Sequence, residues 1–450
     1  MEHLDLILLG GTVVNGEEQH KADVGIKHGK IQLIAADLSQ YPATEKLDIS
    51  GRFLLPGIID VHVHPVYTDD IEYSSYVAAF GGTTTLLHFI YARPGQDLLP
   101  VMEQAIEEAE RSSRLDFGLH CGLFEAPKQV CQIKDVLNLG VRSFKFFMTY
   151  LKQGWYTDDY QLIKAMDILA EHGGLPMVHA ENGGGIDYLE DKYLTGPHAS
   201  WKNFNISRPA VLEEEAIFRA ICLAEVTGSP LYIPHVTAER ALRPIRAARE
   251  RGQVVYCETC AHYLSLTEKI LEERGALAKV GPPIRTENDR QALWQALADS
   301  TLQVVASDHA AKLKDPQGDF IQQGFGSPQL ETLFPVTYDE GVNQGRISLQ
   351  RLVQVMCENP AKIFGLYPQK GVIRQGSDAD LVVLNPEKIF TIQADNQHSH
   401  VGYTLYEGRT VKGWPEMTFQ RGQKVLDHDQ VVASPGSGSF LPVSPSGKFI

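Results

Sequence analysis

Two histidines stand two residues apart in the stretch IIDVHVHP (58–65), where His62 and His64 follow an apolar run. Alternate residues of a β-strand point to the same side, so a strand here places both imidazoles on one face. Imidazole is a common ligand of Zn²⁺ and of neighbouring first-row metal ions. Two separately hydrogen-bonded core histidines are the alternative, and the pair alone does not decide between the two interpretations.

Other polar residues occupy similar positions in later apolar runs. They are Lys145 in SFKFFMTY, His179 in LPMVHAEN, His235 in PLYIPHV and Asp308 in LQVVASDHA. If each were buried separately, each would need its own polar partner, whereas one shared site satisfies them together. We therefore predict a single metal site. Lys145 is the anomalous member, because a divalent cation repels an ammonium group.

The elements that would position these residues form a regular alternation. Eight apolar, β-branched runs occur at 57–64, 83–90, 116–124, 143–150, 175–182, 230–236, 253–260 and 302–310. Amphipathic segments of helical length separate them, among them 100–114, 157–173 and 208–228, the last with Ser207 as its expected N-cap and Pro209 at its start. The pattern predicts a (β/α)8 barrel, with a doubly wound open sheet as the alternative. In such barrels the active site lies where the strands end.

Both ends of the chain read differently from its middle. Residues 1–54 contain short strands broken by turns, and strand-like sequence resumes at 379–386 after a helix around 347–365. We expect the two ends to pair into one small β-sandwich domain, residues 1–54 and 366–450, beside a barrel of residues 55–365. The Ser-, Gly- and Pro-rich tail at 434–447 should be extended or mobile unless it docks on a neighbouring subunit.

Composition excludes several classes of function. Lys and Arg number 41 against 56 Asp and Glu, and the net charge of -15 argues against nucleic acid or an anionic membrane as a partner. No apolar run is long enough to span a membrane, and the first residues do not resemble a secretory signal. The six cysteines do not suggest a disulfide framework, so a cytoplasmic protein is expected, with Cys257 and Cys260 as buried strand residues.

The stretches DVHVHP, GVRSFKFFMTY, PMVHAEN, PLYIPHV, ETCAHYLSLT and SDHA resemble the amidohydrolase superfamily, in its cyclic-amidohydrolase branch of dihydropyrimidinases, hydantoinases, allantoinases and dihydroorotases. The resemblance covers nearly the whole chain in the same order. It implies a binuclear metal-dependent hydrolase that opens a cyclic amide or imide C–N bond by attack of a metal-bridging hydroxide. Dihydroorotase is disfavoured, since Val66 stands where that enzyme has arginine.

The resemblance also implies a ligand set. His62, His64 and Asp308 would bind the first divalent ion, and His179 and His235 the second, with Zn²⁺ as the expected metal. Lys145, carboxylated by CO2 to N6-carboxylysine, would bridge the two ions, which resolves its anomalous charge because a carbamate is an anion with two oxygens.

Further roles follow from the same resemblance. Asp308 would move the proton from the nucleophile to the leaving nitrogen, and Tyr150 would donate a hydrogen bond to the oxyanion. Gly281 replaces a serine that helps to hold the substrate amide, and Phe325 aligns with an asparagine. Arg93, just after the second strand, is a candidate for contacting the substrate because it should reach the same rim, and a solvated loop arginine is the favoured alternative.

Other functions are compatible with the same fold and the same set of metal ligands. One is an allantoinase-like ureide hydrolase, or a lactone, N-acyl or carbamoyl hydrolase on the same metal centre. Another is a non-catalytic dihydropyrimidinase-related scaffold, which the presence of every ligand position disfavours. The expected partner is a small cyclic amide, and the expected assembly is a homo-oligomer, either a dimer or a tetramer. The preferred ring, its enantiomer and the native metal are left open.

Overall fold

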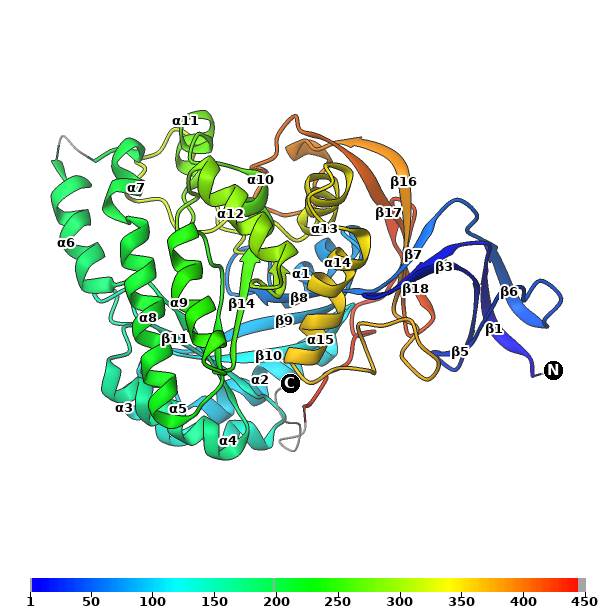
Figure 1. Cartoon of the computed structure of the whole chain (residues 1–450), viewed down its shortest axis with the longest axis horizontal. Helices are drawn as coiled ribbons and strands as arrows, with labels where there is room; N and C mark the ends of the chain where they lie inside the picture. Colours follow the sequence, from blue (N-terminus) through cyan, green and yellow to red (C-terminus); the bar gives the residue numbers. More distant parts are fainter. Residues whose placement is uncertain (1, 197–198, 444–450) are drawn as a thin grey trace.

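The computed structural model describes residues 2–196 and 199–443, and its centre is a sheet of eight parallel strands in chain order (Figure 1). The strands are β8 (Ile58–Val63), β9 (Thr83–Ala92), β10 (Asp116–Leu123), β11 (Ser143–Phe147), β12 (Leu175–His179), β13 (Leu231–Ile233), β14 (Val255–Cys260) and β15 (Val304–Ala306). The NH of His309 donates to the His62 carbonyl at 3.2 Å, and the NH of His64 donates to the His309 carbonyl at 2.9 Å. These bonds join the chain after β15 to β8, so the predicted barrel is confirmed and the open-sheet alternative is wrong.

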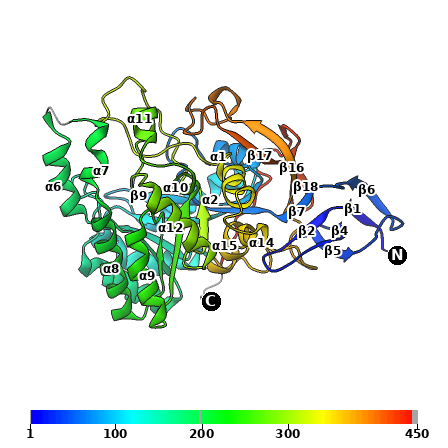
Figure 2. The same ribbon diagram turned by 45° about the horizontal axis from the view of Figure 1, so that its top comes forward.

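Helices cover the outside of the barrel, because both faces of a parallel sheet must be buried (Figures 1 and 2). The main ones are α1 (Ile71–Phe80), α2 (Leu98–Ser112), α4 (Ile133–Asn138), α5 (Asp159–His172), α8 (Ala210–Thr227), α9 (Glu239–Glu250) and α12 (Glu287–Ala298). The expected N-cap of α8 was wrong. Ser207 ends the short helix α7 (Phe204–Ser207), where its hydroxyl donates to the Phe204 carbonyl at 2.7 Å, and Pro209 takes the N-cap position.

Shorter helical segments fill the connections between the main elements. They are α3 (Ala126–Gln129), α6 (Gly183–Tyr193), α10 (Ala261–Ser265), α11 (Ile270–Arg274), α13 (Leu333–Tyr338), α14 (Leu349–Val353) and α15 (Asn359–Ile363), with 3-10 or π turns at Val130–Gln132, Trp201–Asn203, Gly275–Ala278, Asp339–Asn343, Gln354–Glu358 and Ala394–Asn396. The helix expected around 347–365 is therefore present as α14, a π turn and α15. Within residues 2–196 and 199–443, no helix is both long and apolar enough to cross a membrane.

Two further sheets form a β domain beside the barrel, at the right of Figure 1. One sheet has the order β5-β4-β1-β6, and the other has the order β19-β18-β17-β16-β7-β2-β3. Their strands are β1 (Leu4–Leu9), β2 (Thr12–Val14), β3 (Gln19–Lys21), β4 (Asp23–Lys27), β5 (Lys30–Ala35), β6 (Ala43–Asp48), β7 (Phe53–Pro56), β16 (Leu381–Thr391), β17 (Thr410–Gln420), β18 (Gln423–Asp427) and β19 (Gln430–Val431).

The β domain joins both ends of the chain, as expected. Strand β16 pairs antiparallel with β7, so Leu381 lies opposite Pro56. Side chains of both sheets, including Leu6, Ile26 and Phe419, pack in one buried cluster, which makes the domain a sandwich. The domain bounds at residues 54, 55, 365 and 366 stay a prediction.

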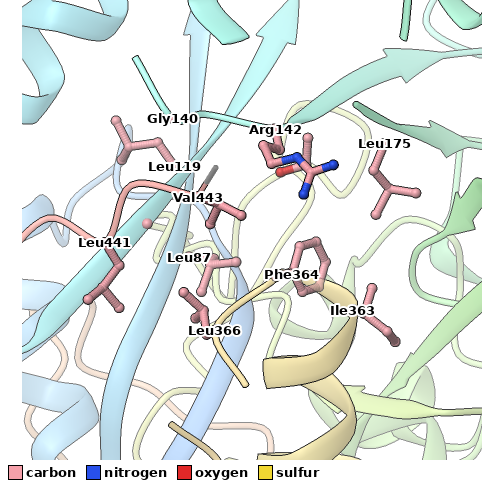
Figure 3. Close-up of a pocket in the computed structure, with 12 residues that line it drawn as sticks. Leu87, Leu119, Gly140, Arg142, Leu175, Ile363, Phe364, Leu366, Leu441 and Val443 are labelled. Atoms are coloured by element: carbon pink, nitrogen blue, oxygen red, sulfur yellow. The ribbon is translucent and has the colours of Figure 1, made fainter. Parts of the chain in front are cut away.

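The described part of the C-terminal tail lies along the barrel of its own chain. The NH of Phe117 donates to the Ser439 carbonyl at 3.0 Å, and the NH of Leu441 donates to the Phe117 carbonyl at 2.8 Å. Leu441 and Val443 also line a small apolar cavity beside the first residues of β10, β11 and β12 (Figure 3). The described part of the tail therefore docks on the barrel of its own chain. Residues 444–447 of the predicted tail lie outside the described residues.

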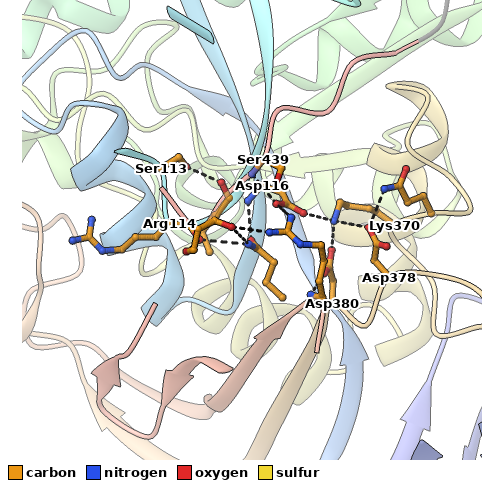
Figure 4. A network of polar contacts seen from close by, with 12 residues as sticks. Ser113, Arg114, Asp116, Lys370, Asp378, Asp380 and Ser439 are labelled. Atoms are coloured by element: carbon orange, nitrogen blue, oxygen red, sulfur yellow. Dashed lines mark hydrogen bonds and ion pairs between the residues drawn. The ribbon is translucent and has the colours of Figure 1, made fainter. Parts of the chain in front are cut away.

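A buried ion cluster joins barrel, β domain and tail (Figure 4). The ammonium of Lys370 contacts three buried carboxylates, those of Asp380 at 2.5 Å, Asp116 at 2.6 Å and Asp378 at 3.0 Å. Asp116 begins β10 and also accepts a hydrogen bond from the backbone NH of Ser439 at 3.0 Å. Lys370 thus neutralises acids that come from separate parts of the fold.

We predict that Lys370→Met lowers the free energy of unfolding by about 3–5 kcal/mol, because it leaves three buried carboxylates without their shared cation. Urea denaturation followed by tryptophan fluorescence measures the change. The matched control is Lys30→Met, which removes a half-exposed lysine from the same Asp378 and should lower the free energy by at most about 1 kcal/mol. Equal losses in the two variants would contradict the role given to Lys370.

Candidate active site

The residues that the sequence singles out as metal ligands line one cavity at the end of the barrel where its strands finish. His62 Nε2 and His64 Nε2 each lie 3.1 Å from Asp308 Oδ1. The His179 and His235 ring centres are 4.4 Å apart, and His235 lies 5.4 Å from the His62 ring. Lys145, from β11, lines the same cavity. The strand ends therefore bring all six side chains together.

Three residues of this site have a strained backbone. Tyr150, His235 and Asp308 have φ values of 65°, 42° and 51°, in the left-handed region that side-chain-bearing residues rarely adopt. Each such residue costs about 1–3 kcal/mol and persists only where its surroundings hold it in place. Each lies two or three residues after the end of a barrel strand and lines the cavity. The strain therefore accompanies the placement of side chains with a chemical role.

The first three ligands fit a divalent cation. His62 Nδ1 contacts the Glu258 carboxylate, whose other oxygen accepts a hydrogen bond from the Tyr232 hydroxyl at 2.7 Å. With the proton on Nδ1, His62 Nε2 would keep a lone pair, and this nitrogen is buried without a hydrogen-bond partner among the described residues. One ligand atom from each of His62, His64 and Asp308 lies within 4.8 Å of the others. An orphaned lone pair beside a carboxylate is what a metal ion would satisfy.

The protonation states of the four histidines and of Asp308 also suit a bound metal ion. Burial lowers the pKa of His62 to about 3 and that of His64 to about 4, and it also lowers the pKa of His179 and of His235. These imidazoles are therefore neutral at neutral pH, which is the form that binds cations. Burial alone would raise the pKa of Asp308, but the interactions with His62 and His64 outweigh burial and hold this pKa below its ordinary value, so the carboxylate is ionised.

A second group surrounds His179. Its Nε2 lies 2.8 Å from Glu181 Oε2, and the same oxygen lies 2.8 Å from an Arg208 guanidinium nitrogen. Glu181 thus occupies one ring nitrogen and leaves His179 Nδ1 as the available ligand atom. The Tyr150 ring centre is 5.3 Å from that of His179, and burial raises the pKa of Tyr150. Tyr150 therefore keeps its proton and can donate a hydrogen bond.

Lys145 is buried in an unusual setting. Its Nζ lies 4.8 Å from the centre of the Phe89 ring, and no carboxylate in the described part of the chain forms an ion pair with it. Burial lowers the pKa of Lys145 to about 8, although Glu258 and Asp308 oppose the shift. A large share of the side chain is therefore a neutral amine near pH 8, and the neutral amine is the form that reacts with CO2.

The two positions that depart from the hydantoinase pattern pack against each other. Gly281 and Phe325 both line the cavity, and a Cβ added to Gly281 would lie 2.9 Å from Cδ1 of Phe325. The phenyl ring thus occupies the space that a side chain at position 281 would need. The guanidinium carbon of Arg208 lies 4.7 Å from the centre of that ring, and Lys279 Nζ lies 4.9 Å from it. Gly281 and Phe325 therefore form one apolar surface. The cationic groups of Arg208 and Lys279 lie close to the Phe325 ring.

Arg93 does not join this site. It is exposed, it does not line the cavity, and its backbone forms a turn with Gln96 in which each residue's NH donates to the other residue. Strand β9 ends at Ala92, and Arg93 lies in the turn that follows. Its exposed position fits the alternative of a solvated loop arginine, and a contact with the substrate stays a prediction.

Several residues of the cavity were missed from the sequence. They are the aromatic residues Tyr67, Tyr91, Phe124, Phe147 and Trp155, together with Gln153 and Lys312. Phe124 stacks on Trp155 at 4.3 Å and on Tyr91 at 4.7 Å, which builds an aromatic wall. Glu258 was also missed, although a carboxylate inside the apolar run that ends in CETC was a usable signal. Cys257 and Cys260 on the same strand are buried free thiols, as expected.

We predict that Glu258→Gln weakens zinc binding by about 10–100-fold, because an amide positions the His62 ring less firmly than the carboxyl group that contacts its Nδ1. Chelator competition on the purified protein gives the dissociation constants. Glu107→Gln makes the same chemical change on the exposed face of α2 and should leave zinc affinity at the wild-type value. If Glu258→Gln bound zinc as tightly as the wild type, the positioning role of Glu258 would be refuted.

Comparison with known proteins gives consistent matches over the chain. Residues 149–425 match the model of the amidohydrolase family. The D-hydantoinase of Ralstonia pickettii is 38% identical over 97% of this chain and 98% of its own length, and the L-hydantoinase of Paenarthrobacter aurescens is 33% identical over 97% and 98%. Among solved structures, a D-hydantoinase superimposes with a TM-score of 0.94 at 36% identity, covering 98% of this chain and 99% of that one. Dihydropyrimidinase from Brevibacillus agri NCHU1002 gives 0.93 at 35%, covering 98% of each chain.

Proposed function

This chain belongs to the amidohydrolase family and is a hydrolase of cyclic amides, and we propose that it opens hydantoin and dihydropyrimidine rings. The observation that carries the proposal is the convergence of four neutral imidazoles, an ionised aspartate and a buried unpaired lysine on one cavity. The non-catalytic alternative is disfavoured because every one of these positions is occupied by a side chain able to bind metal. The likeness to hydantoinases over 97% of the chain disfavours the ureide and lactone alternatives.

We assign two divalent cations to the cavity, with Zn²⁺ as the preferred metal. His62, His64 and Asp308 would hold one, His179 and His235 would hold the other, and a carboxylated Lys145 would contribute one oxygen to each. The support for carboxylation is the burial of Lys145 without an ion-pair partner in the described residues and its lowered pKa. When bound, such ions lower the pKa of water and polarise an amide carbonyl.

The side chains of the cavity supply the remaining chemistry. The ionised Asp308 carboxylate would accept a proton from the attacking water and pass it to the leaving ring nitrogen. The Tyr150 hydroxyl, which keeps its proton, would donate a hydrogen bond to the carbonyl oxygen as negative charge develops there. The aromatic wall of Tyr91, Phe124 and Trp155 offers a flat apolar surface to the substrate and excludes water from the reacting bond.

Assembly and location remain predictions of the sequence. We propose a cytoplasmic homo-oligomer, either a dimer or a tetramer. The support for a reducing compartment is that the six cysteines, in the described part of the chain, are all free.

The proposal is tested with zinc-loaded protein and a panel of hydantoin, dihydrouracil, allantoin and a simple lactone. We expect turnover of hydantoin or dihydrouracil, and Asp308→Asn should lower kcat by about a thousandfold because the proton carrier is lost. Arg93→Ala, at an exposed turn outside the cavity, is the control and should keep the wild-type kcat/KM. Turnover confined to allantoin or the lactone would overturn the proposed substrate class.

We predict that Lys145→Ala loses most of its bound metal and activity. Short carboxylic acids such as acetate or propionate should restore part of both, because their two oxygens can take the place of the carbamate. The matched control is propionamide, which has a similar size and no charge and should restore neither. Metal analysis and hydantoin turnover are measured on the same samples. Full activity in Lys145→Ala without any added acid would refute the bridging role.

A further inference from the structure

A lysine that the proposed chemistry does not use lies in the wall of the same cavity. Lys312 follows Asp308 in the loop after β15, and its Nζ lies 4.1 Å from the centre of the Tyr67 ring. The side chain passes close over Gly324, where an added Cβ would lie 2.6 Å from Cδ and 3.2 Å from Nζ of Lys312. The Tyr403 hydroxyl donates to the Lys312 carbonyl at 3.2 Å. Lys312 is therefore held between an aromatic ring and a glycine, so its ammonium has a defined place.

The charge of Lys312 has no acidic partner. Within residues 2–196 and 199–443, no carboxylate forms an ion pair with Lys312, although acids outnumber bases by 56 to 41 in the whole sequence. Nearby Lys279 and Lys314 also lack carboxylate partners there, and their ammonium groups donate to the backbone carbonyls of Phe320, Ile321, Leu277 and Lys279. Burial, followed by the charges of Lys279 and Lys312, lowers the pKa of Lys314. Lys279, Lys312 and Lys314 thus lie close together without a carboxylate ion-pair partner in the described part of the chain.

The carboxylates in and beside the cavity already contact groups other than Lys312. Asp308 lies against His62 and His64, and Glu181 lies against His179 and Arg208. A partly buried ammonium without a counter-charge is unfavourable, and a cation of this kind inside a binding cavity gains most from an anion on the ligand. An anionic group on the substrate would supply Lys312 with the counter-charge that it lacks among the described residues.

We propose that this enzyme prefers cyclic amides whose ring substituent ends in an anionic group such as a carboxylate, and that Lys312 binds this group. The inference rests on the proposed function and narrows its substrate class. A lysine suits the task, because its ammonium is a compact point charge on a flexible stem that can meet substituents of somewhat different length. The Lys312 ammonium would also attract an anionic substrate to this cavity in a protein of net charge -15.

The experiment compares two hydantoins of nearly equal size, 5-(2-carboxyethyl)hydantoin and 5-(2-carbamoylethyl)hydantoin, which differ in the charge of the substituent. The readout is the ratio of their kcat/KM values with zinc-loaded full-length protein. We expect the wild type to favour the carboxylate by about tenfold or more, as for a hydrogen bond to a charged group. Lys312→Met should bring the ratio close to one, while Lys312→Arg, which keeps the charge, should retain a preference for the carboxylate.

A matched control removes the same charge elsewhere. Lys134→Met, on the exposed face of α4, should keep the wild-type ratio. A wild-type ratio of one or below, or a ratio unchanged in Lys312→Met, would overturn the inference while leaving the proposed function intact if the carbamoyl compound is still opened. If the wild type opens neither compound and no other hydantoin or dihydropyrimidine, the proposed function fails and the inference fails with it.

Discussion

All eight parallel strands of the barrel end at the same rim, and the candidate site depends on this constraint. It brings His64 and Asp308 within 3.1 Å of each other although 244 positions separate them in the chain. The backbone hydrogen bonds between His64 and His309 join the first strand to the chain that follows the last one, next to the pair of ligands. The backbone contacts that close the barrel thus also bring His64 and Asp308 together.

The surrounding residues compensate for what this placement costs. Imidazoles buried in an apolar barrel need partners, and Glu258 and Glu181 provide them for His62 and His179. Glu258 also accepts a hydrogen bond from the backbone NH of His235 at 3.2 Å, where the chain adopts a left-handed conformation. One carboxylate therefore orients a ligand of each proposed cation. Far from the rim, the Lys370 cluster ties the β domain and the tail to the start of β10.

Sequence reasoning succeeded where periodicity and strand ends carry the information. The eight strands, the sandwich formed by both chain ends and the convergence of His62, Lys145 and Asp308 could all be predicted, because these features follow from local pattern and from barrel geometry. The position of Arg93 could not be decided from the sequence, because a turn, and not the strand direction, determines where a loop side chain lies. Lys312 and the contact between Gly281 and Phe325 were beyond reach, since they depend on how loops distant in sequence meet in space.

The central claim is that two cations act together in this cavity on a cyclic amide. Stepwise addition of Zn²⁺ to metal-free protein in bicarbonate buffer, with hydantoin hydrolysis followed at each step, tests it most directly. Activity should rise until two equivalents per chain are bound and then level off. Full activity at one equivalent, or hydrolysis that persists without metal, would contradict it.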